Sequence, residues 1–237
     1  MSLIDIEKPI HDLYSHMYIS LKNQYLFHSV GKAANSTVKF FLYAGEARGT
    51  RYKYESVHDR RSSPLVSPFQ LSEKQLIDIL EQKDFFKFTF VRNPYSRLLS
   101  CYLDRIVPGK STPYKEFVRS IGKELGYEVS FSEFIEVICS QSNREQNNHW
   151  RLQYADAMCD LISYDFIGRQ ESFSKDMEFV WKKIYPKFSV PEFGSRNMSP
   201  SKTGSSARVS EYWDSKLFRL VADRYRKDFD FFGYEAL

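Results

Sequence analysis

Residues 85–91 constrain the fold more than any other segment, because they form a mostly apolar run that contains four phenylalanines. A strand with one face in water alternates apolar and polar residues, whereas a near-continuous apolar run indicates burial on both faces. Such strands belong to parallel sheets covered by helices. The run ends at Arg92-Asn93-Pro94, where Asn93 suits a helix N-cap and Pro94 the first helical position. We therefore expect an α/β fold with a central, mainly parallel sheet flanked by helices.

Other segments extend this alternation of strand and helix. Strand composition occurs at residues 25–30 and 164–168, and more weakly around residues 54–58. Apolar periodicity and capping residues predict helices that begin at residues 35 and 94 and helices over residues 72–82, 132–139, 173–184 and 210–228. The chain 1–237 is expected to be a single domain, with an N-terminal extension (1–22) and two long functional loops (46–70 and 186–208).

The charge balance is too mild to argue for a bulk polyanion partner. The 237 residues carry 34 basic and 30 acidic side chains, a net charge of +4, which does not favour nucleic acid. Three cysteines show no metal-ligand spacing. The N-terminus lacks a signal-peptide pattern, and no apolar run approaches the roughly 18 residues of a membrane span. We expect a soluble, cytoplasmic protein without a transmembrane segment; its oligomeric state is left open.

A first candidate anion site follows the predicted strand at residues 25–30. A loop of small residues leads there into a helix N-terminus, where backbone N–H groups and the helix dipole favour an anion. The candidate ligands are Lys32, Ala33, Ala34, Asn35, Ser36 and Thr37. The order differs from a Walker A loop, because the lysine precedes the small residues. The alternative is a plain strand-to-helix turn with a solvated lysine.

A second candidate anion site begins at Arg92. Its guanidinium should emerge at the carboxyl edge of the sheet, where open α/β folds bind ligands. Ser100 lies about two helical turns later, on the same helix face. A forked guanidinium with a hydroxyl suits a phosphate monoester, although Arg92 could instead pair with a carboxylate. Arg97 is expected at the surface or in a salt bridge.

Together the two segments resemble the sulfotransferase superfamily, in its branch of membrane-type carbohydrate sulfotransferases that includes chondroitin- and heparan-type enzymes. Residues 90–100, FVRNPYSRLLS, match the family motif F-V-R-[ND]-P-[YF]-x-R-L-x-S nearly throughout. Similar segments occur at residues 148–153, 164–171 and 225–234, so the resemblance covers about residues 25–234. It implies the P-loop-NTPase-like sulfotransferase fold. The family's membrane anchor and stem are absent from this sequence, which predicts a soluble bacterial relative or an excised catalytic domain.

The resemblance implies transfer of a sulfuryl group from 3'-phosphoadenosine-5'-phosphosulfate to a hydroxyl of a carbohydrate or glycolipid, with no metal required. Lys32 would stabilise the leaving group, while the rest of its loop binds the 5'-phosphate. Arg92 and Ser100 would bind the 3'-phosphate. Lys202 and Arg208, in a basic loop before the last helix, are further candidates for that phosphate, with a solvated loop as the alternative.

The general base is open between several groups. His58, after the predicted strand at residues 54–58, is the first candidate, because histidine titrates near neutral pH. His149, in a family-like His-Trp pair, is the second, and Glu55 or another carboxylate is the third. Two other functions compete with sulfuryl transfer: a non-catalytic domain that binds the nucleotide or sulfated glycans, and a nucleotide kinase, which the missing Walker A order disfavours.

Overall fold

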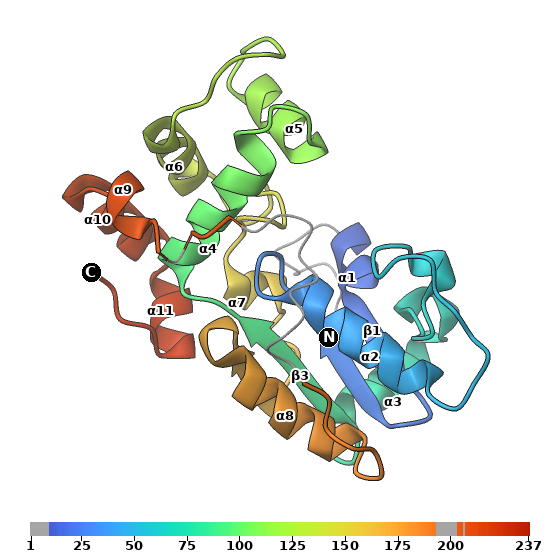
Figure 1. Cartoon of the computed structure of the whole chain (residues 1–237). Helices are drawn as coiled ribbons and strands as arrows, with labels where there is room; N and C mark the ends of the chain where they lie inside the picture. The colour runs from blue at the N-terminus through green and yellow to red at the C-terminus, as the bar shows by residue number, and fades with distance from the viewer. Residues whose placement is uncertain (1–9, 193–202, 206) are drawn as a thin grey trace. The chain divides into compact units, whose positions relative to one another are not determined.

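A computed structural model of the chain describes residues 10–192, 203–205 and 207–237 (Figure 1). Its contacts divide the chain into two compact units. The first unit consists of Met1–Val91 and Ala157–Pro200, and the second of Arg92–Asp156 and Ser201–Leu237. No helix in the described ranges is long and apolar enough to cross a lipid bilayer.

The first unit contains a four-stranded sheet in chain order: β1 (Met17–Ser20), β2 (Tyr25–His28), β3 (Phe86–Val91) and β4 (Phe166–Arg169). β1 is antiparallel to β2, whereas β2, β3 and β4 are parallel. Every residue of β3 is buried, as its apolar run predicts. The predicted α/β fold with a mainly parallel sheet is confirmed. The sequence analysis did not predict β1, which lies in the segment described there as an N-terminal extension.

Helices cover both faces of this sheet. Tyr25 and Phe27 of β2 share one apolar cluster with α2 (Asn35–Ala47) and α8 (Phe173–Ile184). The intervening Leu26 points to the opposite face, in a cluster with Ile79 of α3 (Glu73–Glu81). Because β2 and β3 are parallel, their carboxyl ends lie at the same edge of the sheet, and Thr89 Oγ1 donates to the His28 carbonyl at 2.8 Å. α1 (Ile10–His16) precedes β1.

The predicted strand at residues 54–58 is wrong. This segment contains no assigned strand, and a turn closes where the Asp59 N–H donates to the Ser56 carbonyl at 3.1 Å. Tyr54 and Val57 pack against the apolar cluster of the sheet, but Glu55, Ser56 and His58 are exposed, so the segment does not alternate as a strand would. Short 3₁₀ helices follow at η2 (Arg60–Ser62) and η3 (Pro68–Gln70), and another, η5 (Gln170–Ser172), precedes α8.

The second unit is helical. Its elements are α4 (Pro94–Cys101), the π-helical η4 (Tyr102–Ile106), α5 (Thr112–Ser120), α6 (Phe131–Ser140), α7 (Gln153–Asp156), α9 (Val209–Tyr212), α10 (Ser215–Arg224) and α11 (Arg226–Phe232). Asn93 caps α4 as predicted, because its side chain accepts from the Tyr95 and Ser96 N–H groups. The single helix predicted over 210–228 is divided, since Asp214 caps a new helix by accepting from the Leu217 N–H.

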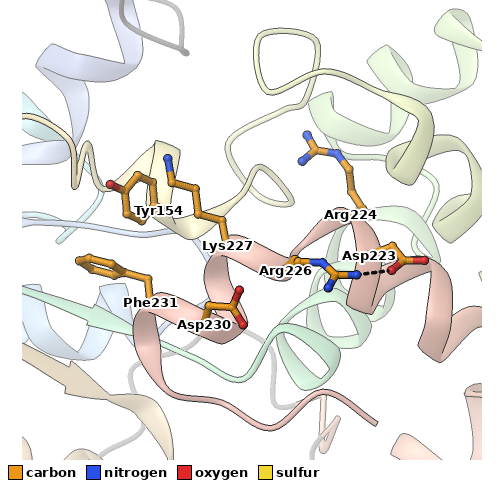
Figure 2. A pocket seen from close by; sticks show the side chains of 7 residues that line it. All are labelled: Tyr154, Asp223, Arg224, Arg226, Lys227, Asp230 and Phe231. Carbon is orange, nitrogen blue, oxygen red and sulfur yellow. Dashed lines mark hydrogen bonds and ion pairs between the residues drawn. The ribbon is translucent and has the colours of Figure 1, made fainter.

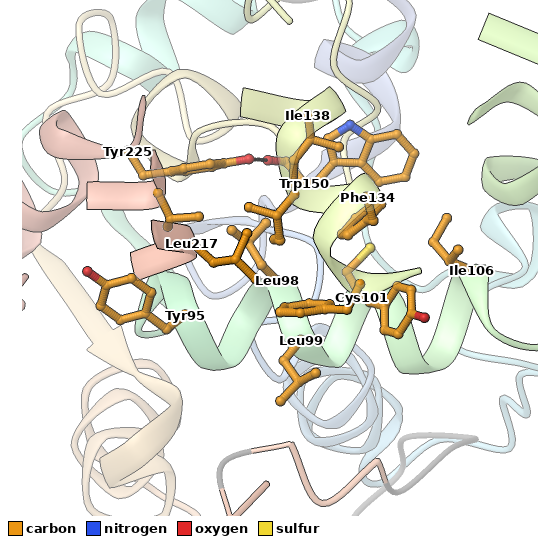
Figure 3. Packing of buried hydrophobic residues seen from close by; sticks show 14 of the residues in the cluster. Tyr95, Leu98, Leu99, Cys101, Ile106, Phe134, Ile138, Trp150, Leu217 and Tyr225 are labelled. Carbon is orange, nitrogen blue, oxygen red and sulfur yellow. Dashed lines mark hydrogen bonds between the residues drawn. The ribbon is translucent and has the colours of Figure 1, made fainter. Parts of the chain in front are cut away.

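The apolar core of the second unit fixes α4 in place (Figure 3). Leu98 and Cys101 of α4 pack with Phe134 of α6 and Leu217 of α10, and all four are at most 2% exposed. Trp150 belongs to the same core. Side chains that project from α4 therefore start from a rigid support.

Candidate functional site

The turn between β2 and α2 has an unusual backbone. Lys32 and Ala34 have positive φ angles of 65° and 58°, which residues other than glycine seldom adopt. Alternating φ signs direct successive N–H groups to one side, as in anion-binding nests. Ala34, at the N-cap of α2, has no side chain that can cap, and the first turn of this fully described helix contains no acidic residue. The positive end of the helix dipole is therefore available to an anion.

The remaining predicted ligands differ in exposure. Ala33 and Thr37 are 1% and 7% exposed, so their side chains pack inside the unit. Lys32, Asn35 and Ser36 are half-buried. The structure thus places all the predicted residues of this turn together, with Ala33 able to contribute only its backbone.

His58 lies beside the same turn. Its Nε2 is 3.2 Å from Ser36 Oγ, and its backbone N–H donates to Ser56 Oγ at 3.2 Å. The imidazole is exposed. The first candidate base therefore contacts a candidate 5'-phosphate ligand within the first unit.

Arg92 directly follows β3 and is 8% exposed. Its Nε donates to Ser96 Oγ at 3.2 Å, and its Nη2 donates to Ser205 Oγ at 2.9 Å. Thr203 Oγ1 lies 3.4 Å from Ser100 Oγ and 3.2 Å from Ser205 Oγ. We call these five residues the Arg92 group. Because hydroxyls rotate and can donate, a guanidinium among them suits a phosphate monoester.

The backbone of Arg92 is held by the side chain of Gln153. The Arg92 N–H donates to Gln153 Oε1 at 2.9 Å, and Gln153 Nε2 donates to the Arg92 carbonyl at 2.8 Å. Asp228 in turn accepts from the N–H groups of Gln153 and Tyr154 at 2.9 and 2.8 Å. Burial raises the pKa of the Asp228 carboxyl, against the opposing effect of those N–H groups. Sequence reasoning assigned no role to Gln153 or Asp228, although both lie in family-like segments.

Ser96, Thr203 and Ser205 were not predicted as ligands either. Ser96 lies four residues after Arg92, a spacing that brings side chains together at a helix start and could have indicated it. Thr203 and Ser205 reach Arg92 only through tertiary folding, which no local pattern encodes.

Of the two basic candidates after residue 200, the structure describes only Arg208, which makes its ion pair and hydrogen bond outside the Arg92 group. Arg208 Nε pairs with Glu211 Oε2 at 2.8 Å, and its Nη2 donates to the Tyr212 hydroxyl at 2.9 Å. Lys202 lies outside the described residues. Their roles at a phosphate stay predictions.

The structure corrects the expected position of Arg97. The expected surface position is wrong, because its side chain is 0% exposed. Its Nη1 donates to the Arg151 carbonyl at 2.8 Å and its Nη2 to the Asn148 carbonyl at 3.3 Å. These carbonyls need donors inside the unit, and Arg97 supplies them. Arg97 thereby fixes the turn that carries His149.

A family model described as the sulfotransferase family matches residues 15–235. The chain belongs to the sulfotransferase family. Carbohydrate sulfotransferase 11 of Danio rerio is 24% identical over 245 residues, which cover 92% of this chain and 67% of the relative. Carbohydrate sulfotransferase 14 of Mus musculus is 27% identical over 242 residues, covering 94% and 61%. These matches confirm the resemblance to the carbohydrate branch.

The relatives are longer than this chain. Carbohydrate sulfotransferase 12 of Xenopus laevis is 26% identical over 181 residues, covering 65% of this chain and 41% of the relative. The matched region thus spans between two fifths and two thirds of these relatives. No solved structure matches the chain.

One surface pocket of this family member, of about 610 Å³, lies on α10 and α11 (Figure 2). None of the predicted site residues lines it. Two carboxylates and three cationic side chains line it, and Arg226 Nη2 pairs with Asp223 Oδ1 at 2.8 Å. Lys227 Nζ lies 3.7 Å from the centre of the Tyr154 ring. No serine or threonine lines the pocket, so it lacks the aliphatic hydroxyls that surround the Arg92 guanidinium.

Proposed function

We propose that this chain is a sulfotransferase that moves a sulfuryl group from 3'-phosphoadenosine-5'-phosphosulfate to a hydroxyl of a carbohydrate or glycolipid. The observation that carries the proposal is the Arg92 group: a buried guanidinium, aligned by Ser96 and Ser205, at the carboxyl end of a central parallel strand. Family membership implies the same donor. A 3'-phosphate is one feature that distinguishes this donor from ATP, and it is the one that the Arg92 group would bind.

The turn at Lys32 would bind the other end of the donor. Its nest-like backbone and the N-terminus of α2 suit the 5'-phosphosulfate. In the transfer, the bond between sulfur and the bridging oxygen breaks and a bond from sulfur to the acceptor oxygen forms. Negative charge develops on the leaving phosphate, where the Lys32 ammonium stabilises it. 3',5'-Adenosine bisphosphate is released.

His58 is the proposed base that takes the proton from the acceptor hydroxyl. Its contact with Ser36 supports this role, because a base must lie near the transferring group. His149, in the second unit, and Glu55 are the alternatives. A cytoplasmic location likewise stays a proposal.

Calorimetry of the full chain tests the donor site. We expect 3',5'-adenosine bisphosphate to bind more tightly than ATP. Arg92→Lys keeps the charge but loses the forked geometry, and should weaken binding of the bisphosphate by about 10-fold to 100-fold. Arg226→Lys, an exposed arginine in an ion pair, is the matched control and should bind normally. Tighter binding of ATP would overturn the proposal and favour a kinase.

Turnover with labelled donor tests catalysis. The acceptors are a panel of unsulfated polysaccharides and glycolipids that includes unsulfated chondroitin. His58→Ala should retain affinity for the bisphosphate and lose roughly 100-fold or more in kcat. Binding without any transfer by the wild type would instead identify a non-catalytic binding domain.

A further inference from the structure

Three side chains of the second unit, separate from the Arg92 group, form a hydrogen-bonded series that ends at His149. Asn147 Oδ1 accepts from the His149 backbone N–H at 3.1 Å and lies 2.6 Å from the ring Nδ1. At the other end of the same amide, Asn147 Nδ2 donates to Glu116 Oε2 at 3.0 Å. Glu116 projects from α5, so the series joins two segments that are distant in sequence.

These contacts determine which ring nitrogen of His149 carries a proton. An amide oxygen can only accept, so the ring Nδ1 must carry the hydrogen that it donates to Asn147 Oδ1. The reversed Asn147 amide would direct its NH₂ group at the His149 backbone N–H and its oxygen at the Glu116 carboxylate, and would lose both of these contacts. In the neutral ring, the acceptor lone pair therefore belongs to Nε2.

The turn that carries His149 is rigidly supported. Trp150 is 2% exposed, and its carbonyl accepts from the Tyr225 hydroxyl at 2.6 Å (Figure 3). Arg97 holds the Asn148 carbonyl on the other side of His149. His149 itself is half-buried. The ring therefore has a fixed position and a fixed orientation.

We propose that Asn147 and Glu116 are positioning residues that hold His149 in the Nδ1–H tautomer, so that its Nε2 accepts a hydrogen bond from a hydroxyl of the carbohydrate acceptor. The inference rests on the proposed function and assigns His149 to acceptor binding, leaving proton removal to His58. One neutral hydrogen bond contributes about 1 kcal/mol, which corresponds to about a 5-fold change in affinity.

The tautomer is tested by ¹⁵N NMR of the full chain with labelled histidine at pH 8, the His149 signals being assigned by comparison with His149→Gln. We expect Nδ1–H in the wild type. Asn147→Asp keeps an oxygen acceptor and should retain this tautomer, whereas Asn147→Ala should shift the ring towards Nε2–H. An Nε2–H ring in the wild type, or identical spectra for the wild type and Asn147→Ala, overturns the proposal.

The role of Glu116 has a matched control. Glu145 is also an exposed carboxylate of this unit, but it accepts from the Ser142 N–H and hydroxyl. Glu116→Ala should broaden the His149 signals or mix its tautomers, because the Asn147 amide loses its second contact. Glu145→Ala removes the same charge and should leave the tautomer unchanged. Equal effects of the two substitutions would remove Glu116 from the proposal.

Kinetics test the link to the acceptor. With unsulfated chondroitin, Asn147→Ala should raise KM about 5-fold, while Kd for 3',5'-adenosine bisphosphate is unchanged. A changed tautomer with an unchanged KM overturns the acceptor contact and leaves the proposed function intact. If the wild type transfers sulfuryl groups to no member of the panel, the proposed function fails, and the tautomer result still decides how Asn147 and Glu116 act.

Discussion

The clamp on the Arg92 backbone gives the sharpest prediction. Gln153 makes two hydrogen bonds to Arg92, at 2.9 and 2.8 Å, much as a neighbouring strand would. Gln153→Ala removes both. The Arg92 N–H and carbonyl are then left without these partners at a residue that is 8% exposed.

The size of the expected loss of stability follows from the cost of burying polar backbone groups without hydrogen-bond partners. A buried backbone group without a partner costs roughly 1–3 kcal/mol, so the two together should lower the free energy of unfolding by about 2–6 kcal/mol. This is a large part of the roughly 5–15 kcal/mol that stabilises a typical protein. Because the Arg92 side chain would also lose its fixed starting point, affinity for 3',5'-adenosine bisphosphate should fall by at least about 10-fold.

Urea denaturation and calorimetry measure the two effects. Gln153→Glu tests the mechanism, because an ionised carboxylate keeps the acceptor and loses the donor, whereas a protonated carboxyl group can supply both. Burial beside Asp228 should raise the folded-state pKa of the introduced carboxyl, so its stability deficit should be smallest below about pH 4 and grow as pH rises through that pKa. A Gln153→Ala protein with wild-type stability and wild-type affinity would refute the reasoning.

Two other substitutions test the first unit. Lys39 is 3% exposed, and burial together with the nearby positive charge of Arg60 lowers its pKa to about 8. Between about pH 8 and 10 the unfolded chain therefore binds more protons than the folded protein, so the free energy of unfolding should rise with pH in this range. Lys39→Met should abolish this rise and add on the order of 3 kcal/mol at pH 7, as measured by urea denaturation, and an unchanged pH dependence would contradict the pKa. A Cβ at Gly168 would lie 2.6 Å from Phe90 Cε1, so Gly168→Ala should cost about 1–3 kcal/mol in thermal unfolding. A wild-type melting temperature would contradict this clash.

Local signals explain which elements could be predicted. The apolar run of β3 and the capping residues Ser72 and Asn93 act within a few residues, and the structure confirms all three. β1 was missed because its four residues are defined by antiparallel pairing with β2 rather than by a pattern of their own. The helix over 210–228 was predicted as one because periodicity alone does not register the cap at Asp214.

The same difference between local and long-range signals applies to the candidate site. Arg92 and the Lys32 turn were found because each follows a predicted strand and lies within a short sequence motif. The supports of Arg92 could not be found in this way, because Gln153 lies 61 residues away in sequence and Ser205 lies 113 residues away. The general base stays a prediction, since no sequence pattern states which histidine meets the acceptor.

The turn around His149 has a consequence for how this protein can diversify. Arg97 and Tyr225 donate hydrogen bonds to the carbonyls of Asn148 and Trp150, which are main-chain groups that every amino acid has. These two anchors do not depend on the side chains of residues 147–149, whereas the His149 ring depends on the Asn147 side chain. A library randomised at these three positions therefore keeps the main-chain anchors of the turn while it tests whether the turn sets the choice of acceptor.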